Sequence, residues 1–284
     1  MKELKTEHLQ IDKLYPFKGH PFKVLDNEEM DQLVESILSQ GVLIPLVVRP
    51  LGNGEYEVIS GHRRLHACKK AGIGTIPALI MDMDRDAAAI ALVDSNLHRE
   101  HILPSEKAFA YKLKMDALNR QGQRTDLTSD QLGRKLESAE IIAQESNDSK
   151  TQVRRYIRLT NLIPEILQMV DDGRIALTPA VEISYLTKQE QADLLETMEC
   201  EDCTPSLSQA IQMKQLSQAG ELDTDTIFGI LTQLKPNQQE KISFKVSELR
   251  SYFPRSYTAS QMTQDILKGL ELLRQRREQN RDSR

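Results

Sequence analysis

Hydrophobic and polar residues follow two different patterns along the chain, and the pattern changes near residue 120. Before that point, short apolar runs typical of strands are interspersed with segments in which apolar residues recur every three or four positions. Beyond it the strand-like runs nearly disappear, and amphipathic helical segments follow one another. The pattern therefore predicts an α+β domain at the N-terminus and an all-α region after it.

In the first part, the predicted strands cover residues 11–15, 46–49, 55–59 and 75–80, and the predicted helices cover 28–40, 62–71, 84–96 and 104–119. The first helix has Asn27 as its N-cap and Gly41 at its end. Its apolar residues, which we expect to form one buried face, are Met30, Leu33, Val34, Ile37 and Leu38.

The polar segment 121–129 is a predicted linker, and the helices expected after it cover residues 130–137, 139–146, 150–160, 164–172, 179–186, 188–198 and 205–219. A strand-like run follows at 241–246, and Thr258 is the expected cap of a long helix reaching toward Arg277. In that helix Met262, Ile266, Leu270 and Leu273 form an apolar face for dimerisation or for packing within its own domain. The predicted domains are 1–119, 120–200 and 201–284, the last a small, mostly helical C-terminal region.

Residues 138–159 have the pattern of a helix-turn-helix. Ser138 is a predicted N-cap of the first helix, and residues 147–149 form a polar turn. In the second helix Val153 and Ile157 lie four apart and can pack inward together. The side chains expected to project outward, toward DNA, are Lys150, Thr151, Gln152, Arg154, Arg155 and Arg158. Tyr156 is expected to pack sideways, and the alternative for the whole face is an ordinary solvated helix surface.

Charge favours the DNA interpretation. The chain has 37 basic and 42 acidic residues, a formal net charge of -5, yet residues 149–162 carry no acid. Phosphate contacts depend on such local clusters and not on the total charge. The longest apolar stretch, 42–48, is far shorter than the roughly 20 residues of a membrane span, and the N-terminus lacks the apolar run of a signal peptide. We therefore expect a cytoplasmic protein; association with the nucleoid or a plasmid is implied only by the family resemblance described below.

Three cysteines suit a reducing compartment. Cys200 and Cys203 form a C-x-x-C pair, but no second Cys or His pair lies at the spacing of a structural zinc site. Neighbouring carboxylates should raise both thiol pKa values, opposite to what a redox motif needs. An incidental surface pair is therefore favoured over a metal or redox site.

A second candidate site begins at Gly61, between a predicted strand and a predicted helix. Glycine lets the backbone approach an anion, the first N–H groups of the helix point toward it, and Arg63 and Arg64 can bind phosphate oxygens. The alternative is a pair of solvated arginines at a common kind of turn. His62 and His66 lie four apart like a metal-binding pair, but no third ligand accompanies them, and surface positions are favoured.

A related cluster lies at residues 95–100 (SNLHRE). Asn96 supplies an oxygen of the kind that Mg²⁺ accepts beside nucleotide phosphates, and Arg99 supplies a further phosphate contact. The alternative is a helix C-terminus capped by Asn96, with Arg99 bound to the last carbonyl groups. The functional interpretation requires that this cluster and the Gly61 turn lie at one site.

With these motifs, the chain resembles the ParB/RepB/Spo0J-like partition protein family, in its plasmid or mobile-element branch. The similar segments occur in the family's order over about residues 8–200: 15–17 with Phe22 and 35–37, 41–50 (GVLIPLVVRP), 56–67 (YEVISGHRRLHA), 70–72 with 76–77, 96–100 (NLHRE), 104–106 and 110–111. The resemblance implies a sulfiredoxin-like N-terminal domain followed by the helix-turn-helix domain.

The resemblance also implies a mechanism. Dimers of this family recognise a palindromic, centromere-like DNA site and bind CTP with Mg²⁺, which closes them into a clamp that slides along DNA. By resemblance, Gly61, Arg63 and Arg64 hold the triphosphate, Asn96 holds Mg²⁺, and Arg99 supports the phosphates. Residues 41–45 would lie near the cytosine. The competing interpretation is a transcriptional repressor of the same architecture that has no nucleotide switch.

The sequence departs from the family's pattern at several positions. Ser95 replaces a Glu linked to CTP hydrolysis, so we expect at most weak hydrolysis and no catalytic residue. His62 and Ile44 replace a usual Glu and a usual Gln. The N-terminus is too short for the basic motif by which many relatives stimulate a ParA-like ATPase, which leaves that partner open. Gly61 stands where sulfiredoxins carry their catalytic Cys, and no carboxylate cluster near it could hold a nuclease's metal, so neither enzyme is expected.

Overall fold

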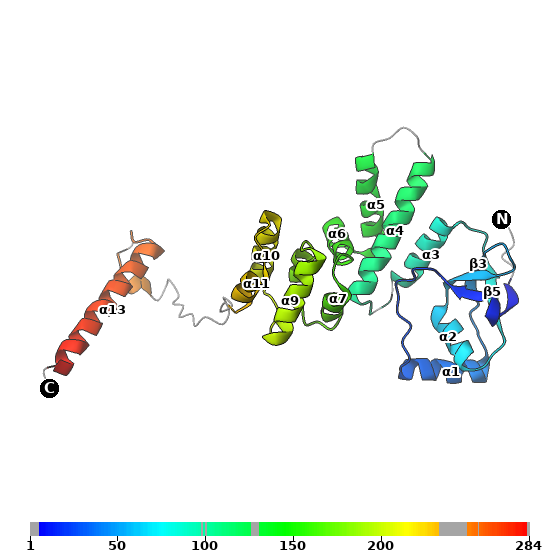
Figure 1. The fold of residues 1–284 in the computed structure, drawn as a ribbon, viewed down its shortest axis with the longest axis horizontal. Helices are drawn as coiled ribbons and strands as arrows, with labels where there is room; N and C mark the ends of the chain where they lie inside the picture. Colours follow the sequence, from blue (N-terminus) through cyan, green and yellow to red (C-terminus); the bar gives the residue numbers. More distant parts are fainter. Residues whose placement is uncertain are drawn as a thin grey trace. The chain divides into compact units, whose positions relative to one another are not determined.

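The computed structural model describes residues 6–97, 99, 101–125, 131–232, 249–254 and 256–282. It divides the chain into two compact units, Met1–Gln233 and Leu234–Arg284, and Figure 1 shows the elements of each. The first unit contains a sheet with its covering helices and a set of packed helices, and the second contains one long helix. Among the described residues, no helix is long and apolar enough to cross a membrane. The predicted α+β domain followed by an all-α region is confirmed.

The N-terminal sheet has five strands in the order β1-β5-β3-β4-β2. Their bounds are Thr6–Gln10 for β1, Leu14–Pro16 for β2, Leu46–Pro50 for β3, Tyr56–Ser60 for β4 and Thr75–Ile80 for β5. Strand β3 lies at the centre, parallel to β5 and antiparallel to β4, while β2 joins β4 in parallel and β1 joins β5 antiparallel. The sheet is therefore mixed, and its order places the ends of β3 and β4 next to each other.

Both faces of the sheet are buried. Val58 and Ile59 are successive residues of β4, so their side chains point to opposite faces. Val58 packs in a core with Met30 of helix α1 (Glu28–Gln40) and Leu65 of helix α2 (His62–Lys70). Ile59 packs in a second core with residues of helix α3 (Arg85–Leu97), among them Leu92. This double burial accounts for the nearly continuous apolar runs of the strands.

The local predictions for α1 are largely confirmed. The Asn27 side chain accepts a hydrogen bond from the Met30 N–H at 3.2 Å, and Gly41 ends the helix with a φ of 74°. Leu38 is the exception, because it is 62% exposed, outside the buried face. Residues 11–15 are not one strand as predicted: they divide into a 3-10 turn, Ile11–Lys13, and the start of β2.

Helix α4 (Pro104–Thr125) is the longest in the first unit and joins its two parts. It packs against α3, and also against α5 (Gln131–Ser146), α6 (Lys150–Leu159) and α7 (Pro164–Asp171), as Figure 1 shows. The predicted linker is wrong for residues 121–125, which continue the helix, whereas 126–129 lie outside the described residues. None of the residues 121–125 is a proline, so the backbone can continue the hydrogen-bond ladder of α4.

The predicted break at Ser138 is also wrong, because α5 runs through it as one helix. Ser138 is buried, and its hydroxyl donates to Oδ1 of Asn119 on α4 at 3.0 Å. A serine within a helix usually competes with the backbone for hydrogen bonds. Here its hydroxyl has a partner on another helix, so no N-cap forms.

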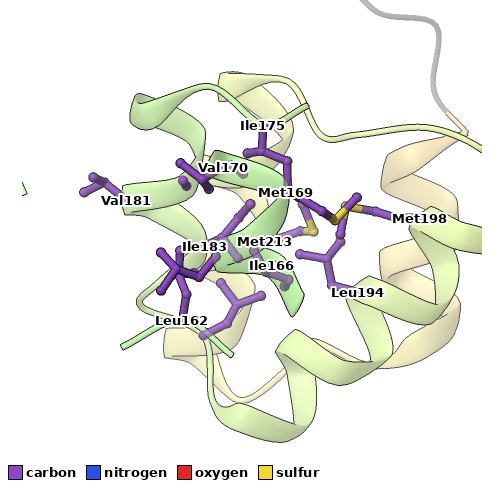
Figure 2. Packing of buried hydrophobic residues seen from close by; sticks show 14 of the residues in the cluster. Leu162, Ile166, Met169, Val170, Ile175, Val181, Ile183, Leu194, Met198 and Met213 are labelled. Carbon is purple, nitrogen blue, oxygen red and sulfur yellow. The ribbon is translucent and has the colours of Figure 1, made fainter. Parts of the chain in front are cut away.

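The remaining helices of this unit share one core. They are α7, α8 (Leu177–Ile183), α9 (Lys188–Cys200), α10 (Leu207–Ala219) and α11 (Thr224–Leu231), the last of which was not predicted. Figure 2 shows Ile166, Leu194, Met198 and Met213 converging from α7, α9 and α10. Because α10 and α11 contribute Ala210 and Ile227 to this core, they pack with the helices that precede residue 200.

The second unit contains a 3-10 turn, Arg250–Tyr252, and helix α13 (Ala259–Asp282). Thr258 caps α13 as predicted: its N–H donates to Oε1 of Gln261 at 2.9 Å, and its Oγ1 accepts from the N–H of Gln261 at 3.4 Å. Met262 is buried, whereas the leucines further along the helix are exposed. The predicted strand 241–246 lies outside the described residues.

Candidate functional site

Helices α5 and α6 form the predicted helix-turn-helix. Asn147 takes the left-handed conformation in the turn, with a φ of 58°, which asparagine tolerates better than most residues. The Ser149 hydroxyl then accepts from the Gln152 N–H at 3.1 Å and caps α6. Val153 is fully buried against Ile142 of α5, as its spacing predicted, and Ile157 is partly buried beside them.

The turn is held on α4 by Asp148. Its carboxylate accepts from the Tyr111 hydroxyl and forms an ion pair with the Lys107 Nζ at 2.7 Å. Burial, together with the hydrogen bond to Asp148, raises the pKa of Tyr111, so the phenol stays protonated as the donor. Tyr156 of α6 packs edge-on against Tyr111 with ring centroids 5.9 Å apart, which confirms its sideways orientation. The helix-turn-helix is therefore fixed to the helix that also supports the sheet domain.

The six predicted DNA-contacting residues have different surroundings. Thr151, Arg154 and Arg155 are exposed, and Gln152 is half-buried at the start of α6. Lys150 forms an ion pair with Glu140 at 3.3 Å. Arg158 is bound within the protein, because its guanidinium donates to both the hydroxyl and the carbonyl oxygen of Ser184. The side chains most available to a partner are thus Arg154 and Arg155.

The second site begins at the end of β4, where Gly61 has a φ of 104° as N-cap of α2. A Cβ at this position would lie 2.9 Å from Cγ of Leu46 and 3.1 Å from Nη2 of Arg64. Glycine is therefore required both by the backbone conformation and by the space. The result is a tight turn that brings His62, Arg63 and Arg64 onto the first turn of the helix.

The two arginines of this turn have different partners. Arg63 forms an ion pair with Glu29 of α1 at 3.0 Å, and both side chains are exposed. The Arg64 guanidinium donates to the carbonyl oxygens of Ile44 and Pro45, and its partial burial lowers its pKa. Arg64 thus fixes the 41–45 loop beside the turn, although the Ile44 side chain itself is 68% exposed.

Asn96 and Arg99 lie at the end of α3. Asn96 is buried, and its Nδ2 donates to the Leu92 carbonyl at 2.7 Å and to the Ser95 hydroxyl at 3.2 Å. Both bonds use the amide nitrogen, which leaves the Oδ1 oxygen as the group able to bind a cation. The Arg99 guanidinium lies over the Phe22 ring, 5.4 Å from its centroid.

The Gly61 turn and the end of α3 lie at one place. Ring contacts link them: Phe22, under Arg99, lies against His20 with ring centroids 5.7 Å apart, and His20 packs on His62 at 3.7 Å. Burial lowers the pKa of Arg99, Glu106 opposes this effect, and the charge of Arg63 adds to it. The charge of Arg99 also helps to lower the pKa of His62. We call Arg63, Arg64 and Arg99 the arginine cluster. The partners Glu29 and Phe22 could not have been found from the sequence, because each lies more than 30 residues from the arginine that it contacts.

A buried lysine connects this region with the helix-turn-helix. Lys114 of α4 is fully buried, and its ammonium group forms ion pairs with Asp94 of α3 and with Glu145 of α5. Asp94 lies two residues before Asn96, and Glu145 lies in α5, the first helix of the helix-turn-helix. The same side chain therefore supports both candidate sites.

The other predicted metal-like patterns do not form a cluster. His66 contacts Asp26 at 3.0 Å, and Cys200 is exposed at the end of α9. Among the residues that the structure describes, no group of three or more His, Cys, Asp or Glu side chains is placed to hold a metal ion.

Similarity to known proteins decides the family. Residues 1–97 match the ParB N-terminal domain. The chain is 30% identical over 266 residues to a probable chromosome-partitioning protein ParB of Vibrio cholerae. The aligned region covers 93% of this chain and 84% of that protein. The chain belongs to the ParB family. The resemblance noted from the motifs at Gly61 and Asn96 is thereby confirmed.

Two solved structures of a C-terminally truncated ParB from Caulobacter crescentus are also similar to this ParB-family chain. The first, complexed with the centromeric parS site, is 22% identical and covers 79% of this chain and 98% of that one, with a TM-score of 0.41. The second, complexed with CTP-γ-S, is 25% identical and covers 69% of this chain and 99% of that one, with a TM-score of 0.32.

Proposed function

We propose that this ParB-family chain is a sequence-specific DNA-binding protein of chromosome or plasmid partition. It acts as a dimeric clamp on a palindromic, centromere-like site and is gated by CTP. The observation that carries the proposal is the surface of α6, where Arg154 and Arg155 are exposed on a helix without an acidic residue.

The chemistry of α6 suits DNA. A guanidinium group can donate two hydrogen bonds to a guanine edge or to phosphate oxygens. Arg154 and Arg155 are adjacent, so they point about 100° apart around the helix. One of them can thus contact base edges while the other contacts the DNA phosphate backbone. The first contact would provide sequence specificity, and the second would position the helix on the DNA. The anchoring of the turn through Asp148 keeps this surface rigid.

The arginine cluster suits a nucleoside triphosphate. Three guanidinium groups gather beside the start of α2, whose first N–H groups also favour an anion. The present partner of Arg63, Glu29, is an exposed carboxylate. Exposed pairs of this kind contribute about 0–1 kcal/mol, so a phosphate group can replace Glu29 at little cost. Arg64 holds the 41–45 loop at the same place, where it can contact the cytosine ring.

Mg²⁺ would bind at Asn96, whose Oδ1 is the hard oxygen that this ion prefers. The ion supplies charge neutralisation of the phosphates when bound. Ser95 has no carboxylate, and its hydroxyl donates to the Leu92 carbonyl at 2.9 Å. Because it cannot act as a general base as a Glu would, we propose that the chain binds CTP and hydrolyses it weakly or not at all.

The clamp proposal is tested by DNase footprints on the bound DNA site with and without CTP. Protection that extends from the site into flanking DNA when CTP is added supports the gated clamp. Protection confined to the site under both conditions supports the alternative, a repressor without a nucleotide switch.

The arginine cluster is tested by calorimetry of CTP binding. Arg63→Ala and Arg64→Ala should each weaken binding at least tenfold, since each removes a charged hydrogen bond of about 1.5–3 kcal/mol. Lys69→Ala is the matched control, because Lys69 is an exposed cation on the same helix. Equal affinity of the two arginine variants and the wild-type protein would show that the phosphates bind elsewhere.

A further inference from the structure

Two histidines pack ring against ring beside the arginine cluster. The imidazole rings of His20 and His62 have centroids 3.7 Å apart and are tilted by 42°. His62 is the first residue of α2, between Gly61 and Arg63, and His20 lies in the segment between β2 and α1. The contact joins positions 42 residues apart.

Hydrogen bonds fix the protonation of both rings. Nδ1 of His20 lies 2.8 Å from the carbonyl oxygen of Phe22, which can only accept, so the ring proton is on Nδ1. Nε2 of His62 accepts from the Phe17 N–H at 3.4 Å, so its proton is on Nδ1. Nε2 of His20 is buried without a hydrogen-bond partner among the described residues, and in the neutral ring it carries a lone pair. Burial favours the neutral form of both rings, and in that form one basic nitrogen is unused.

The surroundings keep the pair neutral. Burial lowers the pKa of His62 to about 3, with smaller effects from His20 and Arg99. Burial also lowers the pKa of His20; the hydrogen bond to the Phe22 carbonyl opposes this effect, and the charge of Arg99 adds to it. The charged groups around the pair are Arg63 on α2, Arg99 after α3, and Glu106 of α4, whose carboxylate accepts from the N–H groups of Lys23 and Leu103. The charge of Arg99 thus opposes protonation of both rings.

We infer that the His20–His62 pair is an additional part of the anion site, and that it takes up one proton when a triphosphate binds. The inference rests on the proposed nucleotide site. A bound triphosphate compensates the charges of Arg63 and Arg99 and supplies a counter-charge to an imidazolium. The proton comes from the buffer and adds to the unused lone pair, without any other bond being made or broken. Only one proton enters, because two imidazolium rings in contact repel each other.

The sign of the pH effect follows from this proton uptake. Since the complex holds more protons than the free protein, binding strengthens as the pH falls. If one proton is taken up, the affinity changes by up to about tenfold per pH unit. This holds at pH values between the pKa of the free pair and the pKa of the bound pair. The ligand also titrates in this range, so the effect must be measured against a variant with neutral side chains and the same ligand.

The experiment is calorimetry of Mg²⁺–CTP and of inorganic triphosphate, from about pH 8 to about pH 6, in buffers of different ionisation enthalpy. The wild-type chain is compared with the His20→Gln/His62→Gln variant. His66→Gln is the matched control, because His66 lies on the same helix but pairs with Asp26 outside the cluster. On binding the ligand, the wild-type chain and the control should take up as much as one more proton than the double variant. Their affinity for the ligand should also rise relative to that of the double variant as the pH falls.

The outcomes separate the inference from the proposed function. Equal proton uptake by the wild-type chain and the double variant, with both ligands bound, would overturn the histidine inference and leave the nucleotide site intact. Binding of inorganic triphosphate with the extra proton, but no binding of CTP, would support the inference and contradict the CTP proposal. If neither ligand binds the folded wild-type chain, the arginine cluster is not an anion site and both are wrong. Thermal unfolding of each variant verifies that it is folded.

Discussion

Arg158 lies over the ring of Tyr185, with its Cζ atom 3.9 Å from the ring centroid. The same guanidinium donates to the Ser184 hydroxyl at 3.2 Å and to the Ser184 carbonyl at 3.1 Å. Lys214 of α10 also contacts the Tyr185 ring, with its Nζ 3.9 Å from the centroid. Arg158 therefore ties α6 to the end of α8, and its surroundings differ from those of the exposed arginines on the same helix.

This difference gives a first prediction. Arg158→Ala should lower the free energy of unfolding by about 1–3 kcal/mol, because it removes two charged hydrogen bonds and a cation–π contact. Arg154→Ala should change it by less than about 0.5 kcal/mol, since Arg154 is exposed. Urea denaturation of the two variants provides the measurement. Similar stabilities of the two variants would show that the Arg158 contacts contribute little to the fold.

A second prediction concerns the turn before α2. Gly61→Ala should destabilise the protein by roughly 1–3 kcal/mol, because alanine is strained at a φ of 104° and its Cβ would lie too close to Leu46. Gly74→Ala is the matched control, since a Cβ there meets no atom within 4 Å. Thermal unfolding of both variants tests this. Equal melting temperatures would mean that the turn accepts a side chain without strain.

A third prediction is a pH dependence of stability without any ligand. The pKa of His62 lies at about 3 in the folded state, against 6.5 ordinarily, so below pH 6.5 the unfolded chain takes up a proton that the folded chain does not. Stability from the neutral ring is therefore present above pH 6.5 and is lost as the pH falls toward 3. In His62→Gln the free energy of unfolding should therefore fall less steeply as the pH decreases, by up to about 1.4 kcal/mol per pH unit.

Denaturant titrations between about pH 7 and about pH 4 measure this slope. A parallel loss of stability in His62→Gln and the wild-type protein would show that the fold does not hold the His62 ring neutral.

A fourth prediction concerns dimerisation through α13. Leu267, Leu270, Leu272 and Leu273 are all exposed in the single chain, although leucine side chains gain about 1.5–3 kcal/mol from full burial. A second copy of the helix would cover them, as the proposed clamp requires. Leu270→Glu should shift the protein from dimer to monomer in sedimentation, whereas Gln264→Glu, an exposed change on the same helix, should not. A dimer that persists in Leu270→Glu at low concentration would place the interface elsewhere.

The features that could be predicted from the sequence are those determined by local chemistry. Asn27 and Gly41 delimit α1 because capping and positive φ depend on the residue itself. Val153 could be assigned to the inside of α6 because helical spacing determines its face. The Gly61 turn was predicted for the same reason, since a strand, a glycine and a basic helix start follow one another directly.

The features that could not be predicted depend on distant partners. Nothing near Lys114 in the sequence shows that it is buried, because Asp94 and Glu145 lie 20 and 31 residues away. The segment around Arg158 likewise gives no sign of Tyr185, so spacing alone assigned this arginine to the DNA-contacting set. The convergence of Arg63 and Arg99 is also a property of the tertiary fold, and only the family resemblance anticipated it.

The most direct test of the central proposal is selection of DNA from a random pool by the wild-type chain and by the Arg154→Ala/Arg155→Ala variant. We predict that the wild-type chain enriches one palindromic sequence and that the folded variant enriches none, because α6 loses both exposed guanidinium groups. Enrichment of no sequence by the wild-type chain, or of the same palindrome by both proteins, would contradict sequence-specific DNA binding through α6.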